Sequence, residues 1–87
     1  MFVGQVSIQD PLGLHARPAG EIVRLSRELG IAIRLGRPGA ALVSANGPLA
    51  LLALKLKTGD HVTVEIESSD SEQVTQVMAR LQEILKG

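Results

Sequence analysis

Three stretches of the chain, residues 2–9, 31–35 and 62–66, place most of their larger apolar side chains at alternate positions. This spacing is typical of half-buried strands, in which one face packs on a core and the other meets solvent. A fourth, shorter strand is expected at residues 40–44, after a turn rich in glycine and proline at residues 36–39.

Three other stretches have the features of helices. Residues 16–29 repeat apolar side chains with a helical period and are followed by Gly30, a residue type that commonly ends helices. Pro48 opens a short apolar helix, since a proline at the first helical position loses no hydrogen bond. Ser69 and Glu72 form an S-x-x-E capping box, which predicts the start of the last helix. The apolar face expected for residues 16–29 consists of Ala19, Ile22, Val23, Ser26 and Leu29.

The predicted order of elements, β-α-β-β-α-β-α, defines the expected fold class. Strands with one polar face and helices with one apolar face favour an α+β fold with two layers, a sheet covered on one side. The 87 residues suffice for one compact domain, and no linker, repeat or low-complexity segment divides them. We therefore expect a single domain over residues 1–87.

Charge and composition remove several classes of function. Lys plus Arg number 9 and Asp plus Glu number 9, so no overall charge attracts nucleic acid or an anionic membrane. Phe2 is the only aromatic residue, which leaves no platform for stacking bases. No apolar run is long enough to span a membrane and no signal peptide is evident, so we expect no membrane insertion and a cytoplasmic location. The absence of cysteine fits that compartment.

Metal and cofactor sites are not expected either. The two histidines, His15 and His61, are too far apart in sequence to form a metal-binding motif, and there is no cysteine. The chain has no glycine-rich nucleotide loop and no paired catalytic base. We therefore expect no metal, no cofactor and no independent enzymatic activity.

The segment around His15 is the best candidate for chemistry, because it lies where a loop becomes a helix. The first amides of a helix have no internal partners and carry partial positive charge, so those of Ala16 and Arg17 are suited to bind a phosphate. The same positive potential favours the neutral imidazole of His15, whose lone pair can attack phosphorus. The guanidinium of Arg17 can neutralise charge on phosphoryl oxygens.

A structural interpretation of these residues remains open at this point. A lone histidine near the start of a helix is often a cap or a surface residue. Arg17 is spaced to pair with Glu21, and Arg24 is spaced to pair with Glu28, on the solvent face of the helix. His61, at the start of a predicted strand, has no evident chemical partner.

The segment Gly13-Leu14-His15-Ala16-Arg17-Pro18-Ala19 resembles the phosphohistidine segment of HPr, the carrier of the bacterial phosphoenolpyruvate-dependent phosphotransferase system. The resemblance extends over the whole chain, including the stretch from Leu51 to Asp60. It implies an open-faced sandwich, with an antiparallel sheet of strand order 1-4-2-3 and three helices on one face. It implies that His15 caps the first helix, which makes Pro18 the third helical residue, although a residue before proline is usually biased away from helical dihedrals.

The resemblance also implies a function and partners. His15 would accept a phosphoryl group on Nδ1 from phosphorylated enzyme I and deliver it to an EIIA-type acceptor protein. The branch, sugar uptake or a nitrogen-type or regulatory relay, stays open. A monomer suits a shuttle of this kind. Many members carry a regulatory serine where this chain has Asn46 and Gly47, so we expect that phosphorylation to be absent.

Partner docking is expected on the first helix and the short second helix, as in the family. The candidate docking residues are Gly20, Arg24, Arg27, Leu49 and Leu52. For the two leucines, burial in the core is an equally good interpretation.

Two other functions stay open. An HPr-like module could dock on partner proteins without onward phosphoryl transfer, although docking alone would need neither His15 nor Arg17. A metabolite-binding domain would need a pocket lined by polar groups, and no cluster of residues indicates one.

Overall fold

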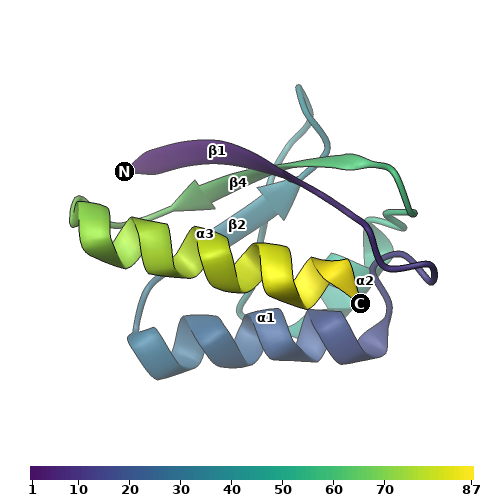
Figure 1. The fold of residues 1–87 in the computed structure, drawn as a ribbon, viewed down its shortest axis with the longest axis horizontal. Helices are drawn as coiled ribbons and strands as arrows, with labels where there is room; N and C mark the ends of the chain where they lie inside the picture. Colours follow the sequence, from purple (N-terminus) through teal and green to yellow (C-terminus); the bar gives the residue numbers. More distant parts are fainter.

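The structure is a computed structural model that describes all residues, 1–87. Its four-stranded antiparallel sheet has the order β1-β4-β2-β3, and three helices cover one face while the other is open (Figure 1). The strands are β1 (Phe2–Ser7), β2 (Ile33–Gly36), β3 (Val43–Ser44) and β4 (His61–Ile66). The helices are α1 (Ala16–Leu29), α2 (Pro48–Ala53) and α3 (Ser71–Lys86). The expected fold class and strand order are confirmed.

The strand register explains why alternate positions are apolar. Val6 of β1 lies opposite Val62 of β4, and both side chains are buried. Val3 lies opposite Glu65, and its side chain is exposed. A shift of one residue would exchange the two faces and expose the core side chains, so burial fixes the register.

The buried face of α1 differs in part from the expected one. Leu25 is buried, whereas Leu29 is 38% exposed. Helix α1 contacts both α2 and α3, so side chains in the middle of the helix are buried over a wider face than contact with the sheet alone would bury. Gly30 follows with φ 64° and ends the helix as predicted.

Strand ends also differ from the sequence prediction, because pairing partners decide them. Strand β1 ends at Ser7. Two residues further on, the amides of Gln9 and Asp10 donate to the carbonyl of Leu85 in α3 and not to a neighbouring strand. Strand β3 is two residues long and not five, because only Val43 and Ser44 pair with β2. Strand β2 begins at residue 33 and not 31.

The capping residue predicted for α3 was wrong. Asp70, and not Ser69, is the N-cap, and its carboxylate accepts hydrogen bonds from the amides of Glu72 and Gln73. Asp is as good a cap as Ser, and the S-x-x-E pattern points one residue too early.

Arg37, in the loop after β2, links the segment that follows α2 to the residue that precedes β4. The guanidinium of Arg37 donates to the carbonyls of Leu54 and Lys55, and to the carboxylate of Asp60 at 3.0 Å. Asp60 also accepts a hydrogen bond from the amide of Lys57. That amide, followed by Arg37, lowers the pKa of Asp60 from its ordinary value of 3.8.

Lys55 provides a test of backbone strain. It is the only residue other than glycine with positive φ, 53°, and its exposed side chain makes no hydrogen bond or ion pair. The left-handed conformation costs a non-glycine residue about 1–2 kcal/mol. Replacement by glycine removes this cost, but about half of the gain in stability is lost because glycine makes the unfolded chain more flexible. We expect Lys55→Gly to raise the free energy of unfolding by about 0.5–1 kcal/mol, measured by urea unfolding. Lys57→Gly, at a position without positive φ, should lower it by a similar amount; stabilisation by both variants would contradict the argument.

Asp60 provides a test of acid sensitivity. Because its pKa is lower in the folded than in the unfolded chain, its stabilising contribution is present above about pH 4 and is lost as the pH falls through the folded value. We expect Asp60→Asn to be less stable than the parent protein near neutral pH and to approach it in acid. The measurement is the urea midpoint of both proteins over a pH series. A difference that does not change with pH would show that the charge of Asp60 contributes nothing.

Candidate functional site

The loop from β1 to α1 places His15 at the N-cap of α1. The amide of Leu14 donates to the carbonyl of Leu56 at 3.0 Å, and the Leu14 side chain is buried in the core. Gly13 has φ 71°, and a Cβ at this position would lie 2.6 Å from the same carbonyl oxygen. Only glycine allows this approach, so Gly13 lets the chain pass close to Leu56 just before His15.

The first amides of α1 are free to bind an anion. His15 is the N-cap, with φ −112° and ψ −173°, and its side chain does not cap the helix. The amides of Ala16 and Arg17 donate no hydrogen bond within the protein. Pro18, the third helical residue as the resemblance implied, has no amide hydrogen. Two unpaired donors therefore lie next to the imidazole, at the positive end of the helix dipole.

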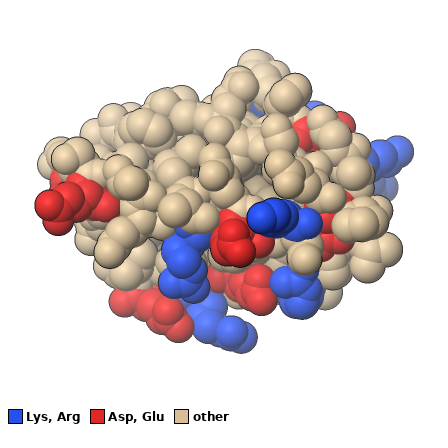
Figure 2. Space-filling model, in the orientation of Figure 1, with Lys and Arg blue, Asp and Glu red and all other residues tan.

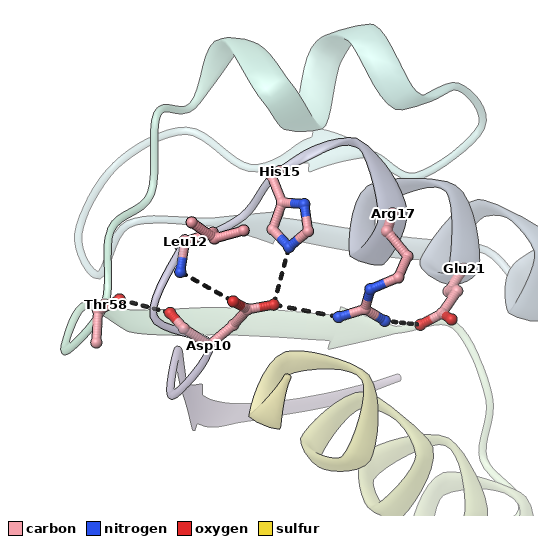
Figure 3. A network of polar contacts seen from close by, with 6 residues as sticks. All are labelled: Asp10, Leu12, His15, Arg17, Glu21 and Thr58. Atoms are coloured by element: carbon pink, nitrogen blue, oxygen red, sulfur yellow. Dashed lines mark hydrogen bonds and ion pairs between the residues drawn. The ribbon is translucent and has the colours of Figure 1, made fainter.

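Asp10 makes the closest polar contact of His15, and sequence analysis did not identify it. Its side chain is almost fully buried, and its Oδ2 lies 2.9 Å from Nε2 of His15 (Figure 3). Its other oxygen, Oδ1, accepts a hydrogen bond from the amide of Leu12 at 2.9 Å. The backbone of Asp10 is held as well, because its amide donates to Leu85 and its carbonyl accepts from the hydroxyl of Thr58.

These contacts determine which nitrogen of His15 carries a proton. The amide of Leu12 and the ring of His15, together with the charge of Arg17, lower the pKa of Asp10 from its ordinary value of 3.8. Asp10 is therefore a carboxylate at neutral pH and can only accept hydrogen bonds. Nε2 must then be the protonated nitrogen, which leaves the lone pair of the neutral ring on Nδ1.

Arg17 lies between two carboxylates. Its guanidinium contacts Oδ2 of Asp10 at 3.1 Å and Oε2 of Glu21 at 3.0 Å (Figure 3). The helical pair of Arg17 and Glu21 considered from the sequence is therefore present, whereas Arg24 and Glu28 form no ion pair. Arg17 is about half exposed, so it can reach an anion bound at the end of the helix.

Charges of both signs alternate around the site. The groove between α1 and α3 is lined by three arginines and three glutamates (Arg17, Arg24, Arg80, Glu21, Glu28 and Glu83). Figure 2 shows acidic and basic side chains interleaved along the lower edge of the molecule, where α1 lies in Figure 1. No large surface of one sign is formed on this face, and the positive character of the site is confined to the helix end and Arg17.

The candidate docking residues lie on α1 and α2, with unequal exposure. Arg24 and Arg27 are exposed, Gly20 is half-buried, and all three line a shallow groove with Pro48. The guanidinium of Arg27 donates to the carbonyl of Asn46 at 3.3 Å, which ties α1 to the segment before α2.

The two leucines proposed for docking differ. Leu49 is 79% exposed, whereas Leu52 is half-buried and packs against the core. Leu12, in the loop before His15, is another exposed large apolar side chain that sequence analysis did not single out.

The second histidine lies apart from this network. His61 is exposed at the start of β4, and its only polar side-chain contact is between Nδ1 and the hydroxyl of Ser7 at 3.4 Å. No group of three or more His, Asp or Glu side chains is arranged to hold a metal ion. None of the helices has the length and apolar character that crossing a bilayer requires.

The chain is similar to proteins of one known family. A family model described as "PTS HPr component phosphorylation site" matches residues 3–86. "Phosphocarrier protein HPr" of Lysinibacillus sphaericus is 32% identical over 81 residues, covering 93% of this chain and 91% of that protein. "Phosphocarrier protein HPr" of Mycoplasma pneumoniae is 32% identical over 69 residues, covering 79% of this chain and 78% of that protein.

Solved structures give the same result. The crystal structure of HPr-C-His from Thermoanaerobacter tengcongensis matches with a TM-score of 0.80 at 25% identity, covering 100% of this chain and 97% of that chain. The match of the family model over almost the full length, together with relatives at 32% identity, is sufficient to assign the family. The chain therefore belongs to the HPr family of phosphocarrier proteins of the phosphotransferase system.

Proposed function

We propose that His15 accepts a phosphoryl group on Nδ1 from phosphorylated enzyme I and passes it to an EIIA-type acceptor protein. One observation carries the proposal. The imidazole has Nε2 bound to a buried carboxylate, which leaves Nδ1 unprotonated at a helix end with two unpaired amides and a guanidinium nearby. These are the groups that phosphoryl transfer requires, namely a positioned nucleophile and donors for the phosphoryl oxygens.

The transfer step needs no other catalytic group in this chain. The lone pair of Nδ1 attacks phosphorus, the new N–P bond forms, and the bond to the donor protein breaks with its electron pair left on the donor. The phosphoryl oxygens are then held by the amides of Ala16 and Arg17 and by the guanidinium of Arg17. Delivery to the acceptor reverses these steps, so the chain carries the group without turning over a substrate alone.

The proposed docking surface consists of the exposed groove on α1 and the apolar residues of α2. Gly20, Arg24 and Arg27 line the groove, and Leu49 supplies an exposed apolar contact beside it. Leu52, half-buried, contributes less area. In this proposal the carrier works as a monomeric single domain, because the imidazole must enter the sites of two partners in turn. Its proposed location is the cytoplasm. The acceptor is proposed only as an EIIA-type protein, of either the sugar-uptake or the nitrogen-type branch.

His15 is tested by its removal. Incubation with enzyme I and phosphoenolpyruvate should add one acid-labile phosphoryl group to the parent protein, detected by intact mass and by phosphorus NMR. We expect His15→Ala to abolish the modification because no other nucleophile lies at the helix end. His61→Ala is the matched control and should be modified normally. A parent protein that binds enzyme I but stays unmodified would instead favour a docking module without phosphoryl transfer.

Arg17 is tested by the rate of the same reaction. Removing a charged donor from the phosphoryl oxygens should cost on the order of ten- to a hundredfold in the rate of phosphorylation. We expect this loss in Arg17→Ala, measured by rapid quench with enzyme I in excess. Arg34→Ala removes an arginine that pairs with Glu65 on the open face of the sheet and should leave the rate unchanged. Equal rates in the parent protein and Arg17→Ala would remove Arg17 from the site.

A further inference from the structure

We propose that Asp10 is a positioning residue that keeps the proton of His15 on Nε2, both before and after phosphorylation. This inference rests on the proposed function, since it concerns the protonation of the proposed acceptor. Asp10 is not part of the segment of residues 13–19 that suggested the function. The structure brings it to His15 through the path of the loop and not through adjacency in sequence.

Asp10 is held too firmly to act as an incidental surface partner. It is 4% exposed, and both carboxylate oxygens have defined partners, the Leu12 amide on one side and the His15 ring on the other. The amide and carbonyl of its backbone are bonded to Leu85 and Thr58. The carboxylate is therefore fixed from two other parts of the chain, the end of α3 and the loop before β4, and it presents Oδ2 to the ring.

The charge of Asp10 suits each stage of the transfer. In the free protein, the carboxylate accepts the Nε2 proton and leaves the lone pair on Nδ1. When Nδ1 bonds to phosphorus, Nε2 keeps its proton and the ring becomes an imidazolium, whose positive charge the carboxylate stabilises. When the group is delivered, the N–P bond breaks and its electron pair returns to Nδ1. No proton is gained or lost in the cycle, and the leaving group is a neutral imidazole and not an imidazolate.

The same oxygen also connects the ring to Arg17. Oδ2 of Asp10 is shared by Nε2 of His15 and the guanidinium of Arg17, which also pairs with Glu21. These three, Asp10, Arg17 and Glu21, are the charged side chains linked to the ring. When the phosphoryl group draws Arg17 toward its oxygens, Asp10 is left to the imidazolium. The negative charge is then concentrated on the partner that has just become positive.

Two substitutions separate the charge of Asp10 from its shape. In Asp10→Asn, the amide of Leu12 still needs an acceptor, so the side-chain carbonyl faces Leu12 and the NH2 group faces Nε2. An NH2 donor at Nε2 favours the proton on Nδ1, which blocks the nucleophile. Asp10→Ala removes the contact and leaves both tautomers populated. The matched control is Asp60→Asn, which removes another turn carboxylate bonded to a backbone amide and an arginine but not to His15.

The experiment measures the ring directly and then the reaction. Nitrogen NMR of the labelled imidazole should show protonated Nε2 in the parent protein and in Asp60→Asn, a shift toward protonated Nδ1 in Asp10→Asn, and a mixture in Asp10→Ala. The rate of phosphorylation by enzyme I should fall about tenfold in both Asp10 variants, the size expected for the loss of one charge-assisted hydrogen bond. Transfer from the phosphorylated Asp10 variants should also decline more steeply with rising pH than transfer from the phosphorylated parent protein, because no carboxylate then holds the proton on Nε2.

The outcomes distinguish this inference from the proposed function. If the parent protein is phosphorylated and the Asp10 variants match it in tautomer, rate and pH profile, the role of Asp10 is refuted and the carrier function stands. If the parent protein is not phosphorylated by enzyme I, the proposed function fails. If Asp10→Ala is unfolded by circular dichroism, Asp10→Asn, which retains the bond to Leu12, decides the matter through its tautomer. An unchanged tautomer in that variant refutes the role.

Discussion

The start of α1 depends on one close approach between two parts of the chain. Gly13 and Leu14 pass against the carbonyl of Leu56, and no side chain at position 13 could be accommodated there. This contact fixes where the loop ends and where the first helical amides point. The position of His15 follows from it, because the imidazole has no capping bond to its own helix. The chemistry of the site therefore rests on a backbone contact made more than forty residues away in sequence, after α2.

The site is organised by competition between charges. An arginine that would bind an incoming anion is already paired with Asp10 and Glu21, so the anion replaces existing contacts and does not fill an empty site. Such an exchange makes binding weaker than three unpaired donors would allow. For a carrier this is an advantage, since a phosphoryl group held too tightly would not be released to an acceptor. The helix amides, which have no competing partner, supply the constant part of the attraction.

Local chemistry was predictable from the sequence, and chemistry that depends on the path of the loop was not. The placement of His15 and Arg17 at a helix start follows from residues adjacent in the chain. The Asp-Pro-Leu-Gly stretch has residue types typical of a turn, and a turn is present, with Asp10 accepting from the Leu12 amide. That the second oxygen of Asp10 reaches the ring depends on contacts with Leu85, which no local pattern reveals. The positive helix end was therefore predictable from the sequence, whereas the carboxylate beside the ring was not.

The errors in the predicted helices and strands have the same origin, namely contacts that local sequence does not reveal. The boundaries of β3 were overestimated because strand propensity extends beyond the two residues that find a partner in β2. The cap of α3 was assigned one residue early because two residues, Ser69 and Asp70, both fit a capping position, and only backbone dihedrals separate them. The face of α1 was misplaced near Leu25 because a helix packed between two others buries more than the period alone indicates.

The two amides that end β1 have a mechanical consequence. Gln9 and Asp10 both donate to the carbonyl of Leu85, so the last turn of α3 and the carboxylate beside His15 share an anchor. Fraying of that turn releases the same backbone that holds Asp10 in place. A change in the order of the last turn of α3 therefore changes the position of Asp10, and with it that of the imidazole, without direct contact with the ring.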